Sequence, residues 1–251
     1  MRFRHEIKYL VNIDEIEPFF KDLEQYCSYD PHVGQTNSYE IASIYYDTKD
    51  LRFYWDREES VGYRRKIRLR SYNTDGISTA LFIEIKEKHK NFVLKKRINL
   101  KSSKVLDLGI PHNEIPLSLV IADLEDTAEA REMNYLHSRL ELHPIVNVRY
   151  IRKPMIPKYE DDMRITLDTK ITAGGTSLSV FNKDEEKFIC DPKHGVLEIK
   201  TNKSIPLWLH SIAKRYHLKH TKFSKYCSGV DVVYGKTPVF ITPETQAQLN
   251  N

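Results

Sequence analysis

Residues 63–72, with the sequence YRRKIRLRSY, predict a β-strand whose two faces differ sharply in charge. Alternate side chains of a strand point to opposite faces of the sheet. One face carries Arg64, Lys66, Arg68 and Arg70. The other face is more apolar and includes Ile67 and Leu69. Because four like charges in a row repel one another, an anionic ligand or water has to offset them.

The same alternation recurs along the chain. It is found in residues 2–10, 81–88, 93–99, 162–168 and 196–201. Each of these stretches places charged side chains on one face and mainly apolar side chains on the other. Three of the charged faces carry a glutamate two residues before a lysine, at Glu6, Glu84 and Glu198.

Two arrangements of the sheet are compatible with these faces. A polar face in contact with water is common in antiparallel sheets and explains each strand taken alone. The abundance of arginine over all the strands favours a sheet that closes into a barrel with its charged faces inward. Helices are predicted at about 14–23, 114–140, 206–218 and 223–233, whereas residues 51–59 are ambiguous. We therefore predict an α+β protein, an antiparallel β-barrel tunnel with helices packed on the outside.

Length, composition and the chain start limit the class of protein. The 251 residues show no internal repeat or long linker, so we expect one domain over residues 1–235 and a polar C-terminal tail over 236–251. The three cysteines have no metal-binding spacing, which argues against structural zinc and indicates a reducing compartment. Neither a secretory signal nor an apolar run of about 20 residues is present. We expect a cytoplasmic protein without a membrane span, either free or peripheral at the inner face of the membrane.

The charged faces indicate the chemistry of the ligand. The planar guanidinium of arginine binds two phosphate oxygens at once. A few carboxylates among cations suit a divalent metal that bridges phosphates. A tunnel of this kind predicts inorganic polyphosphate or a nucleoside triphosphate as ligand. Nucleic acid is not expected, because the cations lack interleaved exposed aromatic residues on which bases could stack.

An ordered set of short motifs resembles a known family. The motifs are HEIKY (5–9), SIYYDT (43–48), KIRLR (66–70), FIEIK (82–86), LKKR (94–97), VRY (148–150), RITLDT (164–169), LEIK (197–200) and FSKY (223–226). Together they resemble the VTC (vacuolar transporter chaperone) domain of the triphosphate tunnel metalloenzyme superfamily, which includes the CYTH enzymes. The resemblance covers residue 1 to about 235. The first strand carries Arg4 where the ExExK motif of CYTH enzymes has its first glutamate, which agrees with the VTC branch.

The resemblance implies a tunnel barrel and a polyphosphate polymerase, a phosphotransferase that moves the γ-phosphate of ATP onto a growing polyphosphate chain. It implies Mn²⁺ or Mg²⁺ as cofactor, and ATP and inorganic polyphosphate as partners. Coupling to a transporter would require a separate membrane-protein partner.

The resemblance also implies roles for particular residues. The expected phosphate-binding residues are Lys8, Arg68, Arg70, Lys86, Lys95, Arg97, Arg149, Arg164, Lys222, Ser224 and Lys225. The expected catalytic residues are Arg68, Arg70, Lys86, Arg149 and Lys200. The expected metal ligands are Glu198 and Glu6.

Several alternatives stay open at this point. The chain could instead be a hydrolase of ATP, tripolyphosphate or thiamine triphosphate, or a polyphosphate-binding module without catalysis. A phosphate acceptor is already nucleophilic at neutral pH, whereas water needs a positioned base, so the few carboxylates favour transfer. Individual residues also have structural alternatives: Glu198 as a partner of Lys200, and Arg149 as a buried, paired arginine.

Overall fold

The computed structural model describes residues 5–31, 33, 35–74, 77–89, 92–100, 113–183 and 185–235. Arg4 and the predicted tail 236–251 lie outside these residues. The strands are β1 (His5–Asn12), β2 (Cys27–Tyr29), β3 (Tyr39–Asp47), β4 (Tyr63–Thr74), β5 (Ile77–His89), β6 (Phe92–Asn99), β7 (His143–Pro157), β8 (Arg164–Gly174), β9 (Lys187–Phe188), β10 (His194–Thr201) and β11 (Lys219–His220). The helices are η1 (Ile13–Glu15), α1 (Ile16–Leu23), α2 (Arg52–Glu58), α4 (Leu117–Ala122), α5 (Ala128–Leu140), α6 (Leu207–Arg215) and α7 (Lys225–Val233).

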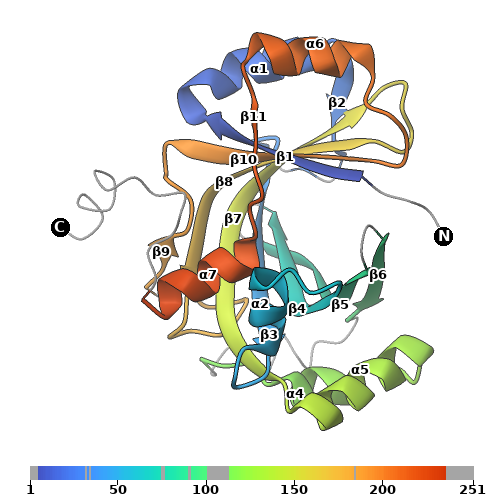
Figure 1. Ribbon diagram of the computed structural model, residues 1–251, viewed down its shortest axis with the longest axis vertical. Coiled ribbons are helices and arrows are strands. Elements are labelled where there is room, and N and C mark those ends of the chain that lie inside the picture. Colours follow the sequence, from blue (N-terminus) through green and yellow to red (C-terminus); the bar gives the residue numbers. More distant parts are fainter. Residues whose placement is uncertain are drawn as a thin grey trace.

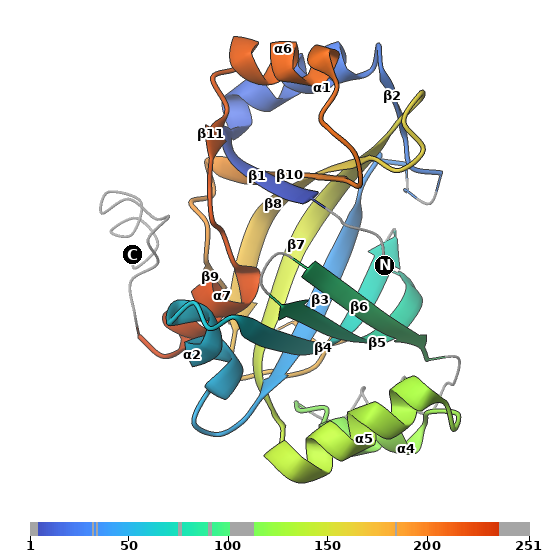
Figure 2. The same ribbon diagram turned by 45° about the vertical axis from the view of Figure 1, so that its right-hand side comes forward.

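The strands belong to one antiparallel sheet in the order β11-β1-β10-β8-β7-β3-β4-β5-β6, with β2 beside β7 and β9 beside β8. The predicted α+β class is confirmed. Figure 2 shows β1 and β10 above β4, β5 and β6, with β3 and β7 running between the two groups. The path of paired strands ends at β11 and β6 in the described residues, so the sheet does not form the closed ring that was expected. Glu6 on β1 and Lys86 on β5 instead form an ion pair of 3.0 Å between the two groups.

The alternation of apolar and charged residues in the sequence explains why one face of the sheet is buried and the other carries charged side chains. In the β4–β5 register, the pair Leu69 and Ile83 is followed by the pair Arg68 and Glu84. The apolar pair is fully buried on the outer face. Because side chains alternate, the same two strands must present their charges to the concave face. The sequence pattern therefore predicts the inward charged face correctly.

Two pairs of helices cover the outer face of the sheet, as Figure 1 shows at the two ends of the molecule. Helices α1 and α6 pack on β1, β8 and β10, with Phe20 and Leu209 in a core that includes Leu197. Helices α4 and α5 pack near β3, β4 and β5, with Leu117 and Met133 in the second core. None of the described helices combines the length and the apolarity required to cross a membrane.

Helix α7 departs from the expectation that all helices lie outside the sheet. Its Tyr226 stacks on Tyr45 of β3, with ring centroids 5.1 Å apart. Tyr45 bonds Arg68 and therefore lies on the concave face. At Gly229, an added Cβ would lie 3.1–3.3 Å from side chains of β7 and β8, so glycine permits the close approach. The concave face is thus partly filled by α7.

Asp47, at the end of β3, connects α2 and α7 to the sheet through hydrogen bonds. Its carboxylate accepts hydrogen bonds from the backbone N–H groups of Phe53 and Tyr54 at 2.9 and 3.0 Å. It also accepts a hydrogen bond from the Tyr226 hydroxyl. The ambiguous residues 51–59 therefore contain a helix whose first turn is stabilised by a buried carboxylate.

Candidate functional site

Two adjoining cavities lie on the concave side of the sheet. The α7 cavity has a volume of about 720 Å³, and the arginine cavity has a volume of about 1120 Å³. Glu6, Lys86 and Val93 line both of them. The α7 cavity is also lined by His5, Lys8, Arg57, Ser60, Arg64, Arg65, Lys66, Lys88, His220, Thr221, Lys222, Phe223 and Ser224. The arginine cavity is also lined by Arg68, Arg70, Tyr72, Lys95, Arg97, Arg152, Ile156, Asp161, Asp162, Met163, Arg164, Thr166, Lys200, Asn202 and Lys203.

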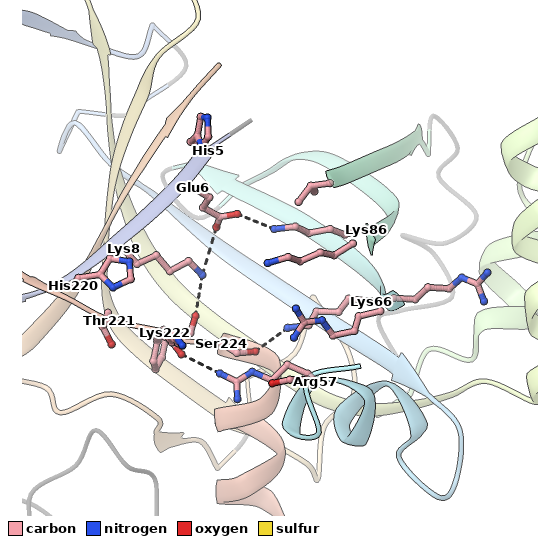
Figure 3. Close-up of a pocket in the computed structure, with 16 residues that line it drawn as sticks. His5, Glu6, Lys8, Arg57, Lys66, Lys86, His220, Thr221, Lys222 and Ser224 are labelled. Carbon is pink, nitrogen blue, oxygen red and sulfur yellow. Dashed lines mark hydrogen bonds and ion pairs between the residues drawn. The ribbon is translucent and has the colours of Figure 1, made fainter. Parts of the chain in front are cut away.

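The α7 cavity surrounds the N-terminus of α7. Figure 3 shows the side chains of Lys8, Lys66 and Lys86 converging there with Glu6 and Ser224. Lys66 Nζ donates to Ser224 Oγ at 2.8 Å, and Ser224 caps the helix by accepting from the backbone N–H of Cys227. The N-terminus of a helix carries a partial positive charge. The lysines and the helix therefore act together to attract an anion.

Glu84 organises the wall of the arginine cavity. It is almost completely buried on β5, with 1% of its surface exposed. Its carboxylate contacts Arg68 at 2.6 Å, Lys95 at 2.5 Å and Arg97 at 2.5 Å. Burial alone would raise its pKa, but the cations around it outweigh burial and hold the pKa far below the usual value. Arg70 lies farther from Glu84, at 4.0 Å, and donates hydrogen bonds to Ser43 Oγ at 3.2 Å and the Tyr150 hydroxyl at 3.0 Å.

Glu198 organises the opposite wall from β10. It contacts Lys200 at 2.6 Å, Lys225 at 3.3 Å, Lys8 at 3.4 Å and Arg152 at 3.6 Å. Burial opposes its ionisation, but these four cations hold its pKa well below the usual value. The neighbouring Asp168 pairs with Arg152 and Lys225 at 2.6 and 2.5 Å.

The structure brings most of the predicted site residues together. The predicted residues that line the two cavities are Glu6, Lys8, Arg68, Arg70, Lys86, Lys95, Arg97, Arg164, Lys200, Lys222 and Ser224. Glu198 and Lys225 are buried directly behind this lining, and Glu198 contacts both Lys8 and Lys225. Residues from six strands and α7 therefore meet at one site, although they are scattered along the sequence.

Arg149 does not join this site. Its guanidinium is buried against Glu186 at 2.8 Å, Glu40 at 3.3 Å and the Ser179 carbonyl at 3.1 Å. It lines neither cavity. The prediction that Arg149 binds phosphate and takes part in catalysis does not fit this position. Its surroundings match the alternative of a buried, paired arginine.

Arg152 occupies the place expected for Arg149 and was missed from the sequence. The pairing of β7 with β8 shifts register between Arg149 and Ile151, and Tyr150 and Arg152 lie on the concave face. Alternation places Arg152, three residues after Arg149, on the opposite face of the strand from Arg149. Lys66 was also left out of the predicted site, although it shares a face with Arg68 and Arg70. The alternation within residues 63–72 already placed Lys66 on the charged face and would have identified it.

The donor set can be compared with the divalent metal that the resemblance implies. Glu6 and Glu198 both contact Lys8 Nζ, at 3.5 and 3.4 Å. The part of the chain that the structure describes contains no group of three or more His, Cys, Asp or Glu residues placed to hold a metal. Mg²⁺ commonly binds one or two carboxylates and takes further ligands from phosphates and water. The two glutamates fit a metal of that kind, which would compete with Lys8 for their oxygens.

Three lysines of the site have pKa values near the physiological range. Burial lowers the pKa of Lys66, Lys95 and Lys200 to about 8 in each case. These ammonium groups are charged below that pH and lose their protons as the pH rises through it. An anionic ligand prefers the charged form, so its affinity has to fall with rising pH.

We therefore expect the affinity for tripolyphosphate to fall about 10-fold or more between about pH 7 and about pH 9. Isothermal titration calorimetry at constant ionic strength measures this directly. A dissociation constant that stays the same over this pH range would show that these lysines do not contact the ligand.

The fold and the site together define an α+β protein with a curled antiparallel sheet and a concave face lined by arginine and lysine. The chain belongs to the VTC domain family, because the model of that family matches residues 3–234. The predicted resemblance is thereby confirmed.

Two curated relatives are similar to the chain over most of its length. The chain is 23% identical over 282 residues to "Vacuolar transporter chaperone complex subunit 4" of Trypanosoma cruzi, covering 94% of this chain and 34% of the relative. It is 26% identical over 244 residues to the subunit of the same name from Trypanosoma brucei brucei, covering 84% of this chain and 30% of the relative. The chain thus spans about a third of the length of these relatives.

Two solved structures are similar at lower levels. The PH1819 protein of Pyrococcus horikoshii has a TM-score of 0.47 at 15% identity, covering 90% of this chain and 97% of that one. A putative adenylate cyclase of Bacillus halodurans has a TM-score of 0.48 at 13% identity, covering 88% of this chain and 95% of that one.

Proposed function

We propose that this chain is a polyphosphate polymerase that transfers the γ-phosphate of ATP to the end of a growing polyphosphate chain. The observation that carries the proposal is the concentration of cations on the concave face. Arg68, Arg70, Lys86, Arg152 and Lys200 reach adjoining cavities from four different strands. Such an arrangement suits an extended polyanion rather than a single phosphate. Membership of the VTC domain family supports the same reading.

The residues of the site would act mainly by positioning and charge neutralisation, which phosphoryl transfer requires. Arg68 and Arg70 would grip the triphosphate, and Lys86 would hold it where the two cavities adjoin. Glu198 and Glu6 would hold Mn²⁺ or Mg²⁺, and the metal would neutralise phosphate oxygens near the scissile bond. Arg68, Arg70 and Lys86 would together orient the acceptor and the donor phosphates in line.

The state of the carboxylates favours transfer over hydrolysis. Glu6 contacts Lys8 and Lys86, and Glu84 and Glu198 each contact at least three cations. Carboxylates paired in this way are poor proton acceptors because their pKa values are low. A terminal phosphate is already ionised and needs no base, whereas an attacking water does.

The setting of the reaction is part of the proposal. The relatives are named as subunits of a complex, and this chain corresponds to about a third of their length. We expect the domain to work in the cytoplasm or at the inner face of a membrane, next to a separate membrane-protein partner. ATP and inorganic polyphosphate would be its ligands, and nucleic acid would not.

Product analysis tests the proposed function. The purified protein, given ATP and Mn²⁺, is expected to form ADP and long phosphate chains that are resolved on a polyacrylamide gel. Free phosphate without chains would identify a hydrolase instead. Binding of tripolyphosphate without any turnover would identify a binding module. Omission of the metal is expected to stop chain formation.

A further inference from the structure

Glu84 holds cations from two neighbouring strands in a fixed geometry. Its Oε2 accepts a hydrogen bond from Arg68 Nε on β4 at 2.7 Å and contacts Arg68 Nη2 at 2.6 Å. Its Oε1 accepts from Arg97 Nε on β6 at 2.6 Å and contacts Lys95 Nζ at 2.5 Å. Both carboxylate oxygens are therefore engaged by groups that line the arginine cavity.

The contacts use only one edge of each guanidinium. Arg68 and Arg97 both meet Glu84 through the edge formed by Nε and Nη2. A guanidinium carries five N–H donors in a rigid plane, so fixing one edge also fixes the direction of the remaining donors. Both side chains remain accessible, with 19% and 36% of their surface exposed. Arg68 Nη1 also donates to the Tyr45 hydroxyl at 3.1 Å, and Arg97 Nη2 to the Tyr72 hydroxyl at 3.0 Å. Glu84 thus fixes the plane of two arginines, whose five donors exceed these contacts and leave N–H groups for a ligand.

Strand β6 is where this restraint has the largest effect. It is an end strand of the described sheet, and Lys95 and Arg97 are both more than a third exposed. Long exposed side chains sample many rotamers, and ordering them costs conformational entropy. The buried Glu84 removes this freedom before any ligand arrives.

We propose that Glu84 is a positioning residue that aligns Arg68, Arg97 and Lys95 on the phosphate being transferred. The proposal rests on the proposed function, since it concerns the geometry of phosphoryl transfer. Catalysis depends on oriented donors, whereas ground-state binding of a polyanion depends mainly on net charge. Loss of Glu84 therefore has to separate turnover from binding.

The Glu84→Gln variant makes this separation measurable. Glutamine keeps the shape but replaces one accepting oxygen with an NH₂ donor, which faces a guanidinium and cannot bond it. The change also makes the cavity more positive by one charge. We expect the dissociation constant for tripolyphosphate to stay within about 3-fold or to tighten, and kcat for chain formation from ATP to fall about 100-fold.

Three further measurements complete the experiment. Glu84→Asp keeps the charge and is expected to restore part of kcat. Glu132→Gln is the matched control, because Glu132 is also ion-paired, to Lys96 on β6 at 2.6 Å, and neither residue lines a cavity of the site. It is expected to leave kcat and binding unchanged. In NMR spectra, the Nε–H signals of Arg68 and Arg97 are expected to exchange slowly in the unmodified protein and rapidly in Glu84→Gln.

The outcomes separate this proposal from the proposed function. Without turnover in the unmodified protein, the polymerase proposal fails, and the NMR measurement still tests the positioning of the arginines. An unchanged kcat in Glu84→Gln, or unchanged Nε–H exchange, overturns the positioning role. Equal losses of kcat and binding also overturn it. If Glu84→Gln does not fold, Glu84→Asp decides: normal kcat in that variant, with altered Nε–H exchange, overturns the proposal.

Discussion

Replacing Arg68 and Arg70 together with alanine is expected to weaken tripolyphosphate binding by about 10²–10⁴-fold. Each arginine offers charge-assisted hydrogen bonds to phosphate, worth about 1.5–3 kcal/mol apiece. A loss of about 1.4 kcal/mol corresponds to a 10-fold weaker affinity. Both side chains line the arginine cavity, so both losses act on one ligand. Isothermal titration calorimetry gives the dissociation constants.

The control for this double variant removes two positive charges elsewhere. Arg131 and Arg139 lie exposed on α5, on the outer side of the sheet, and their replacement with alanine keeps the net charge equal to that of the double variant. This control is expected to bind like the unmodified protein. Near-normal binding by the Arg68/Arg70 variant, with its fold intact by circular dichroism, would rule out the concave face as the ligand site.

The second large effect is expected for Glu198→Gln, which should reduce metal-dependent turnover by about 100-fold or more. The change removes a carboxylate expected to bind the metal. It also removes the ion pairs that Glu198 forms with Lys8 and Lys200. The fold is expected to survive because Lys225 remains paired with Asp168. Rates of chain formation measured over a series of Mn²⁺ concentrations test this.

The design separates a metal role from a general electrostatic role. Glu132→Gln serves as the control, since Glu132 is an ion-paired glutamate on α5, 2.6 Å from Lys96, and lies outside both cavities. A metal ligand is expected to raise the Mn²⁺ concentration needed for half-maximal rate. If Glu198→Gln lowers the rate equally at all Mn²⁺ concentrations, Glu198 acts by holding cations in place. Unchanged turnover would remove Glu198 from the site.

Local alternation was sufficient to predict the inward face of the central strands. Arg68, Arg70 and Lys86 lie where a period of two places them, because strands β4 and β5 pair regularly across this stretch. Arg149 and Arg152 show what the resemblance alone could not decide. The two residues are three apart, so alternation places them on opposite faces of β7, and only the contacts of the fold show which face is concave. The prediction named Arg149, whereas Arg152 lines the arginine cavity.

Two features of the whole molecule also lay beyond the sequence pattern. The pattern of α7 is that of an ordinary helix with one apolar face, and only the tertiary structure shows that this face packs on the concave side of the sheet. The open path from β11 to β6 likewise depends on how far the sheet curls, which twist and side-chain packing decide. Neither property is encoded in a period of two or 3.6 residues.

The position of α7 has a consequence for how the chain folds as it is synthesised. Asp47 leaves the ribosome 179 residues before Tyr226, the α7 residue that donates to it. Asp168 and Glu198 are likewise synthesised well before Lys225, with which both form ion pairs. Until those residues emerge, the nascent sheet holds carboxylates and tyrosines without their helix partner. Folding that depends on such distant contacts is slow and cooperative. The interior of this domain is therefore completed only when α7 has been made.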